Sequence, residues 1–175
     1  VSLGHAAFFG CGAYAAALFA KHVLPDPLAG LAFAVAVSAL LGLASSVLIL
    51  RGSDLTRLMV TLGVASLLYE LANKLDQWTG GADGLQGVVM GPVLTPFGAF
   101  AFDLGGRVAC AYSMALLVAC LLVVRRIVHS PFGFSLQALR DNALRAASIG
   151  LSVHRRLIVA YTIGGAIGGV AGALL

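Results

Sequence analysis

The stretch SPFGFSLQALRDNALRAASIGLSV, residues 130–153, is the one long polar interruption in a very apolar chain, and it decides how the chain is organised. Pro131 can take the first position of a helix with Ser130 as its N-cap. Ser135 is an alternative cap one turn later. Gly150 can end the helix, because glycine is the usual residue just past a helix C-terminus.

A helix over Leu136–Ile149 would be about 21 Å long, which is too short and too charged to cross a bilayer. Arg140 interrupts its apolar face, so we expect this side chain to extend to the edge of the face or to reach a partner. The predicted helix lies along a membrane face or docks into another protein. Leu136, Leu139, Ala143, Ala146 and Ala147 share its apolar face, and Gln137, Asp141, Asn142, Arg145 and Ser148 share the other.

The composition indicates a membrane protein. Of 175 residues, 60% are hydrophobic and 10% are charged, whereas a soluble domain carries about 25% charged residues. The loop 125–156 holds six arginines and a single acid, Asp141. A nucleic-acid surface would need a folded soluble domain, for which this composition leaves no room. We therefore expect membrane lipid, and no nucleic acid, around the chain.

Apolar segments predict the architecture. We expect an all-α polytopic transmembrane helix bundle with about five spans, forming a single domain over residues 1–175. Gly164, Gly168 and Gly172, at spacing four in the last segment, should let another helix approach closely. The predicted spans are Ser2–Ala20, Leu28–Leu50, Leu55–Leu75, Val108–Val124 and Leu157–Leu175.

The arginines also predict the orientation. By the positive-inside rule the loop 125–156 is cytoplasmic, and alternation then places the loop 76–106 on the periplasmic side. Glu70 and Lys74, four residues apart near the end of a predicted span, can pair on one face at the interface.

No enzyme chemistry is visible in the sequence. There is no phosphate-binding Gly-x-x-x-x-Gly-Lys-Ser/Thr stretch, no metal-ligand spacing and no nucleophile elbow. We therefore expect no catalytic residues, no metal and no cofactor, with any ATP bound by another subunit. Polar residues at membrane depth, Ser2, His5 and Tyr14, line a translocation path or bond neighbouring helices. The motif Thr79, Gly80, Gly81, Asp83 and Gly84 forms an anion nest or a tight turn after a helix; it has too few oxygens for calcium.

Three stretches in order carry a resemblance to a known family. They are SLGHAAFFGCGAY (Ser2–Tyr14), TGGADGLQGV (Thr79–Val88), and the polar stretch followed by a glycine-rich apolar helix. Together they resemble branched-chain amino-acid ABC transporter permeases of the LivM type, the inner-membrane components of binding-protein-dependent transport systems. The resemblance covers most of the chain. Since the chain begins at Val1 without a Met, we expect a fragment of a longer permease.

The resemblance implies a function and partners. It implies an importer permease in the bacterial cytoplasmic (inner) membrane that carries branched-chain amino acids (leucine, isoleucine, valine) or related small amino acids or amides. The implied partners are a second permease subunit of the LivH type, two ATPase subunits and a periplasmic amino-acid-binding protein. The implied ATPase-coupling residues are Leu139, Arg140, Asp141, Asn142, Ala146 and Gly150. Ala143 stands where the family often has a second acid, which leaves an ion pair with the ATPase in doubt.

The alternative is a secondary transporter or channel for small polar solutes, which needs no ATPase. Such a carrier needs ion ligands inside the membrane. Glu70 is the only acid inside a hydrophobic segment, and it lies near an end, which favours the importer.

Overall fold

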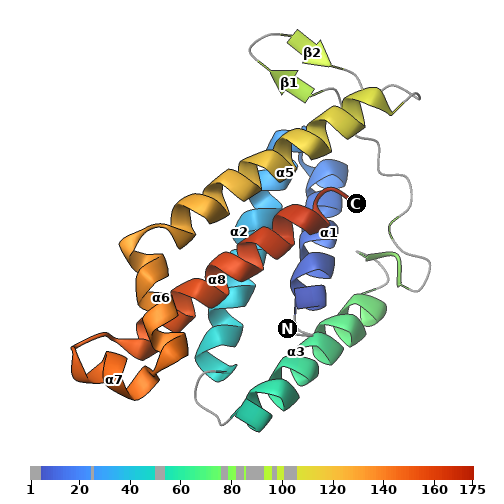
Figure 1. Cartoon of the computed structure of the whole chain (residues 1–175). Coiled ribbons are helices and arrows are strands. Elements are labelled where there is room, and N and C mark those ends of the chain that lie inside the picture. The colour runs from blue at the N-terminus through green and yellow to red at the C-terminus, as the bar shows by residue number, and fades with distance from the viewer. Residues whose placement is uncertain are drawn as a thin grey trace.

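A computed structural model describes residues 5–24, 26–49, 54–75, 79–81, 85, 93–95, 98–100 and 106–175. The long helices are α1 (His5–His22), α2 (Pro27–Ile49), α3 (Asp54–Lys74), α5 (Arg107–Val128) and α8 (Val153–Gly172). Two short helices, α6 (Pro131–Asp141) and α7 (Ala143–Ser148), connect α5 to α8. The chain is a helical bundle, as the sequence predicts (Figure 1).

Within the described residues, two helical segments are long and apolar enough to cross a membrane by length and composition. They are Pro27–Val47 of α2 and Arg107–Val128 of α5. The prediction of about five spans stays a prediction for the other long helices. All three carry charged residues near an end: Lys21 in α1, Lys74 in α3, and Arg155 and Arg156 in α8.

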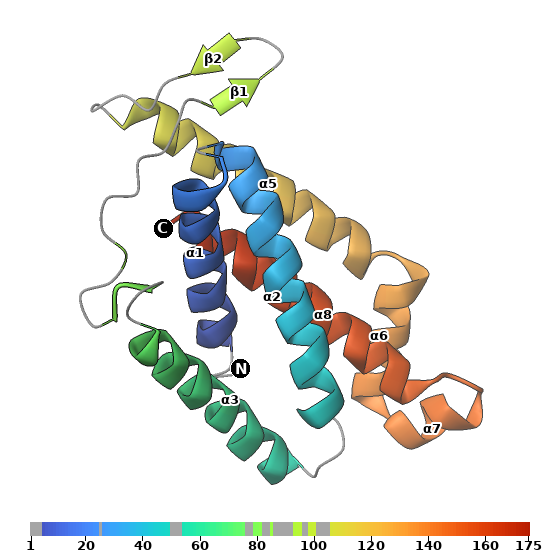
Figure 2. The ribbon, with the colours of Figure 1, turned by 180° about the vertical axis from the view of Figure 1, so that it is seen from behind.

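Three helices, α1, α2 and α8, form the core of the bundle (Figure 2). Two rows of glycine on α8 allow their close approach. A Cβ at Gly169 would lie 2.5 Å from the Ser38 Cβ of α2, and one at Gly172 would lie 2.0 Å from the Phe9 carbonyl oxygen of α1. Side chains at either position would force the helices apart. The predicted close packing of the glycine-rich segment is therefore present, and α8 lies between two partners rather than against one.

Alanine and serine fill the narrow space that the glycines leave. Ala34 and Ser38 of α2 are completely buried. The Ser38 hydroxyl donates a hydrogen bond to the Phe8 carbonyl oxygen of α1, at 3.4 Å. A hydroxyl buried between apolar helices needs such a partner, because an unpaired polar group costs free energy at membrane depth.

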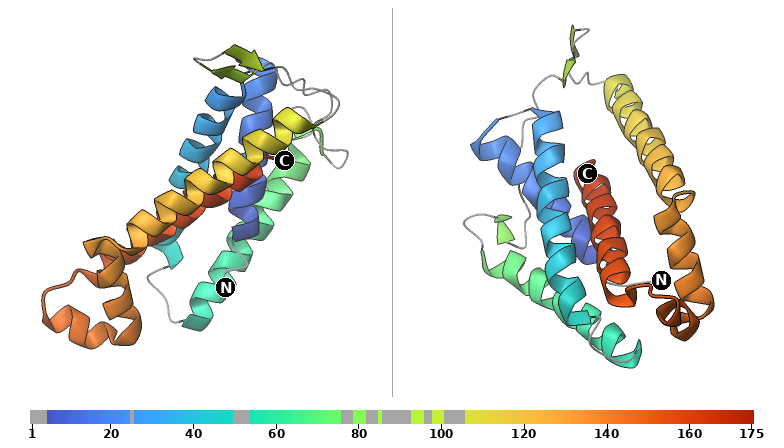
Figure 3. Two further views of the ribbon diagram at one scale, coloured as in Figure 1. Left: turned by 45° about the horizontal axis from the view of Figure 1, so that its top comes forward. Right: turned by 90° about the vertical axis from the view of Figure 1, so that its left-hand side faces the viewer.

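Helices α3 and α5 lie outside this core (Figure 3). Within the described part of the chain, no residue of α5 is buried, and large apolar side chains such as Leu121 and Leu122 are about 60% exposed. On α3, Met59 and Leu67 are exposed to a similar degree. Such surfaces suit contact with lipid or with another membrane subunit.

A short two-stranded ribbon lies within the predicted periplasmic loop. Strands β1 (Val93–Thr95) and β2 (Gly98–Phe100) pair antiparallel, with Val93 opposite Phe100. The prediction of an all-helical chain did not include this ribbon. It lies near the end of the bundle that carries the α1–α2 turn, whereas α6 and α7 lie at the opposite end (Figure 1).

Candidate functional site

The polar stretch begins with a tightly fixed corner between α5 and α6. Ser130 is the N-cap of α6: its hydroxyl accepts a hydrogen bond from the Gly133 N–H at 3.3 Å and donates one to the Ile127 carbonyl oxygen at 2.6 Å. Pro131 takes the first helical position, as predicted. A Cβ at Gly133 would lie 2.1 Å from the Val128 carbonyl oxygen, so only glycine fits. Ser135, the alternative cap, lies inside α6 instead.

Asn142 divides the stretch into two helices. Its backbone is extended, with φ −159° and ψ 100°, and its side-chain oxygen accepts a hydrogen bond from the Arg145 N–H at 3.0 Å. Asparagine is a favoured N-cap because its side chain can satisfy a free N–H at a helix start. The prediction of one continuous helix over Leu136–Ile149 is therefore wrong: α6 ends at Asp141, and Asn142 starts α7.

Gly150 ends α7, as predicted. Its φ is +87°, which disfavours side chains other than that of glycine. The Gly150 N–H donates to the Ala147 carbonyl oxygen at 3.0 Å, and the Leu151 N–H donates to the Ala146 carbonyl oxygen at 3.1 Å. This pair of bonds is a Schellman motif. Both ends of the α6–α7 segment are thus closed by local hydrogen bonds.

The break at Asn142 changes which apolar residues face outward. Leu139 and Ala146 are buried within the chain, so they support the segment from inside. Ala143 and Ala147, expected on the same face, are exposed. Leu144 and Ile149 have exposed fractions of 85% and 72%, and Phe134 on α6 is also exposed. The predicted continuous apolar face does not form, because α7 starts in a new orientation after the extended residue.

The same segment also exposes charged side chains. Arg140 extends into solvent and pairs with Asp141, with 3.5 Å between the Arg140 Nε and an Asp141 carboxylate oxygen. Both side chains are largely exposed, so the pair contributes at most about 1 kcal/mol to stability. Arg145, on α7, is also exposed. The segment therefore exposes both large apolar side chains and arginines.

His5 and Tyr14, two of the three residues predicted for a translocation path, lie on opposite faces of α1. His5 begins α1 and packs edge-on against Phe8, with ring centroids 6.1 Å apart. Tyr14 lies nine residues later, close to the opposite face of the helix at 3.6 residues per turn. It borders a cavity of about 590 Å³ between α1, α5 and the end of α8, and another of about 380 Å³ between α1 and α3. Ser2 lies outside the described residues.

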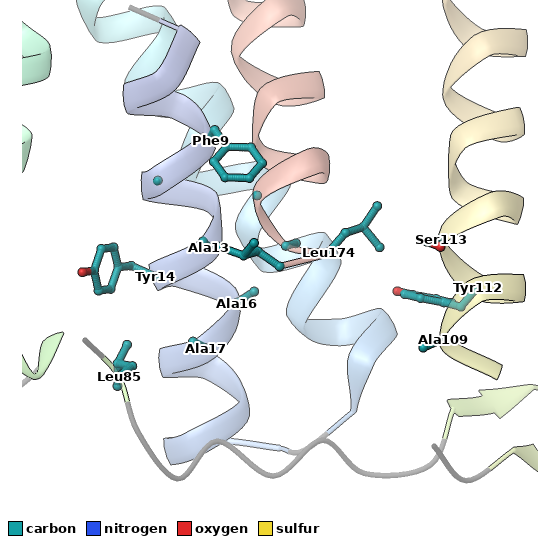
Figure 4. A pocket seen from close by; sticks show the side chains of 14 residues that line it. Phe9, Ala13, Tyr14, Ala16, Ala17, Leu85, Ala109, Tyr112, Ser113 and Leu174 are labelled. Atoms are coloured by element: carbon teal, nitrogen blue, oxygen red, sulfur yellow. The ribbon is translucent and has the colours of Figure 1, made fainter. Parts of the chain in front are cut away.

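The larger cavity is mostly apolar. Phe9, Ala13 and Leu174 face it from α1 and the end of the chain, while Tyr112 and Ser113 reach it from α5 (Figure 4). Since no helix of the described part packs closely along α5, this cavity separates α5 from the core.

The loop motif that starts at Thr79 closes the C-terminal end of α3. The Thr79 hydroxyl lies 2.5 Å from the Ala72 carbonyl oxygen and 2.9 Å from that of Leu75. Gly80 and Gly81 both have positive φ. These residues form a tight turn after the helix. Asp83 and Gly84 lie outside the described residues.

Glu70 and Lys74 do not form the ion pair that their spacing predicts. Both side chains are exposed near the end of α3, and no ion pair joins these two described residues. Exposed pairs of this kind gain little from contact, because water already solvates both charges.

Sequence patterns did not single out Leu144, Ile149 or Arg156. In the structure Leu144 and Ile149 are largely exposed, and Arg156 bonds to Ser135. Asn142 was the available signal for the first two: an asparagine three residues before Arg145 fits a helix N-cap. The position of Arg156 depends on contact with a residue 21 positions away, so no local pattern indicates it.

Comparisons with known proteins cover the whole chain. The family model described as "Branched-chain amino acid transport system / permease component" matches residues 1–175. The high-affinity branched-chain amino acid transport system permease proteins LivM of Escherichia coli (strain K12) and Salmonella typhimurium (strain LT2) are each 33% identical over 198 aligned residues. These alignments cover 98% of this chain and 45% of either relative, so the chain spans about half their length. No solved structure matches the chain significantly.

Proposed function

Because the chain belongs to the family of permease components of branched-chain amino acid transport systems, we propose that it forms part of the membrane-spanning subunit of an ABC importer. It lies in the bacterial cytoplasmic membrane, with the loop 125–156 on the cytoplasmic side and the loop 76–106 on the periplasmic side. The substrate is a branched-chain amino acid or a related small amino acid or amide. Its partners are a LivH-type permease subunit, two ATPase subunits and a periplasmic binding protein.

The observation that carries this proposal is the form of the α6–α7 segment. It is compact and capped at both ends, and it projects from one end of the bundle (Figure 1). Leu144 and Ile149 extend from it with little cover from the chain. An exposed apolar patch on a rigid support is typical of a protein-binding surface. We place the ATPase contact on this patch, with Leu139 and Ala146 supporting it from within.

The charges beside the patch define the partner further. Arg140 and Arg145 are exposed on the same segment, and the loop 125–156 carries only one acid. Complementarity then calls for a groove on the ATPase that is apolar at its base and acidic at its rim. ATP binding in the partner would move the segment and, through it, the helices of the bundle, in an alternating-access cycle.

Substitution of Leu144 tests the proposal. In the full-length permease, Leu144→Glu should insert and accumulate normally, because Leu144 is 85% exposed. The ATPase subunits should no longer co-purify and uptake should stop, since a charge buried without a partner at an interface costs several kcal/mol. Leu144→Met, which keeps an apolar side chain of similar volume, is the control and should retain both. Full ATPase retention and normal uptake with Leu144→Glu would contradict the proposal and favour a carrier without an ATPase.

A further inference from the structure

A hydrogen bond joins the α6–α7 segment to α8 across 21 residues of chain. The guanidinium Nη1 of Arg156, in the first turn of α8, donates to the Ser135 hydroxyl oxygen of α6. Ser135 is buried, and its hydroxyl lies 2.5 Å from the Phe132 carbonyl oxygen, to which it donates. A hydroxyl has one donor and two acceptor positions, so Ser135 can make both bonds at once.

Arg156 is partly buried. Its Nε is buried and forms no hydrogen bond with any residue that the structure describes. The guanidinium group stays charged at all ordinary pH values. The adjacent Arg155 is exposed, so two neighbouring arginines of equal charge occupy different environments. Because only Arg156 is partly covered and bonded to Ser135, we assign it a specific role in the geometry of the loop.

Helix α8, which carries Arg156 in its first turn, packs closely against its neighbours. Within two turns of Arg156, α8 comes into backbone contact with α2: a Cβ at Gly42 would lie 3.4 Å from the Cα of Thr162. Further along the approach is closer still, because a Cβ would lie 2.5 Å from the Ser38 Cβ of α2 at Gly169 and 2.0 Å from the Phe9 carbonyl oxygen of α1 at Gly172. A closely packed helix moves as a rigid element, so displacement at its start reaches the core.

We propose that Arg156 is a positioning residue that transmits movement of the α6–α7 segment to α8 through its bond to Ser135. This inference rests on the proposed function, because it assumes that an ATPase moves the segment. Leu144 and Ile149 then make the contact with the ATPase, while Arg156 and Ser135 link that contact to the transport helices.

The test compares Arg156→Met with Arg155→Met in the full-length permease with its partner subunits. Both changes remove one charge and keep a long side chain, but only the first removes the bond to Ser135. With Arg156→Met, uptake should fall about tenfold or more, the effect of losing one charged hydrogen bond. The ATPase subunits should still co-purify and hydrolyse ATP, because the docking patch is unchanged. Arg155→Met should keep normal uptake.

Two further variants distinguish loss of the Arg156–Ser135 bond from a general folding defect. Arg156→Lys can still donate to the Ser135 hydroxyl and should recover part of the uptake. Ser135→Ala combined with Arg156→Met should lower uptake no further than Arg156→Met alone, because both remove the same bond.

Two results would overturn the inference: uptake by Arg156→Met equal to that of Arg155→Met, or loss of permease recovery in proportion to loss of uptake. The latter would assign Arg156 to folding alone. If the proposed function itself is wrong, ATPase subunits will not co-purify even with the wild-type permease. That result would overturn both proposals.

Discussion

Replacing Gly12 with alanine should force α1 away from α8, whereas the same change at Gly10 should not. A Cβ at Gly12 would lie 2.6 Å from the Gly169 carbonyl oxygen and 2.7 Å from the Gly169 Cα. Both atoms are backbone, so no side chain can rotate to make room. At Gly10, two residues away on the same helix, a Cβ would have nothing within 4 Å.

The size of the effect follows from these distances. Carbon atoms pack at about 3.5–4.0 Å, so the Cβ must move about 1 Å away from the Gly169 Cα. Overpacking of this kind typically costs 1–3 kcal/mol. Alanine also favours the helix over glycine by about 1 kcal/mol, a gain that both variants share. The difference in unfolding free energy between Gly12→Ala and Gly10→Ala therefore isolates the overpacking cost, about 1–3 kcal/mol.

The assay is unfolding of the purified full-length permease in mixed micelles of mild detergent and dodecyl sulfate, followed by the loss of helical signal. Gly12→Ala should unfold at a lower dodecyl sulfate fraction than Gly10→Ala, and Gly10→Ala at the same fraction as wild type or a higher one. Equal stability of the two variants would refute the close α1–α8 contact and the role of α8 in the core.

Two other expectations concern topology and the α5–α6 corner. In a permease lacking Cys11, Cys110 and Cys120, an impermeant thiol reagent should label Ser148→Cys only from the cytoplasm and Leu24→Cys only from outside; reversed labelling would refute the orientation. Gly133→Ala should lower recovery of folded permease, because its Cβ would lie 2.1 Å from the Val128 carbonyl oxygen, while Gly63→Ala, with nothing within 4 Å of its Cβ, should not. Equal recovery of the two would contradict the tight corner.

Local chemistry was enough to predict the two ends of the polar stretch. Ser130 followed by Pro131 suits a helix start, and Gly150 suits a helix end, because each effect depends on the residue and its immediate neighbours. The interruption at Asn142 was missed for a related reason. Apolar residues continue at helical spacing on both sides of it, and periodicity alone does not show that a side chain has replaced the helical hydrogen bond.

Sequence patterns could not predict contacts between residues that lie far apart in the chain. The spacing of Gly164, Gly168 and Gly172 predicted a close helix neighbour, but small residues permit approach without specifying the partner. Gly165 and Gly169, one position further along, face α2, so α8 uses adjacent rows for two neighbours. The Ser135–Arg156 bond likewise depends on how α6 and α8 pack.

The tight corner at Gly133 joins α5 and α6 at a fixed angle, so the two helices form one rigid unit. The Ser130 hydroxyl bonds to both helices, and a Cβ at Gly133 would lie 2.1 Å from the Val128 carbonyl oxygen, so a change in the bend would disturb these close contacts. Helix α5, with 22 residues, is about 33 Å long. A rotation of this unit by about 5° at the corner would displace the far end of α5, near Arg107, by about 3 Å over that length. Since no described residue of α5 is buried, the core offers little resistance to this movement, and a small rotation at the corner becomes a larger displacement at the Arg107 end of α5.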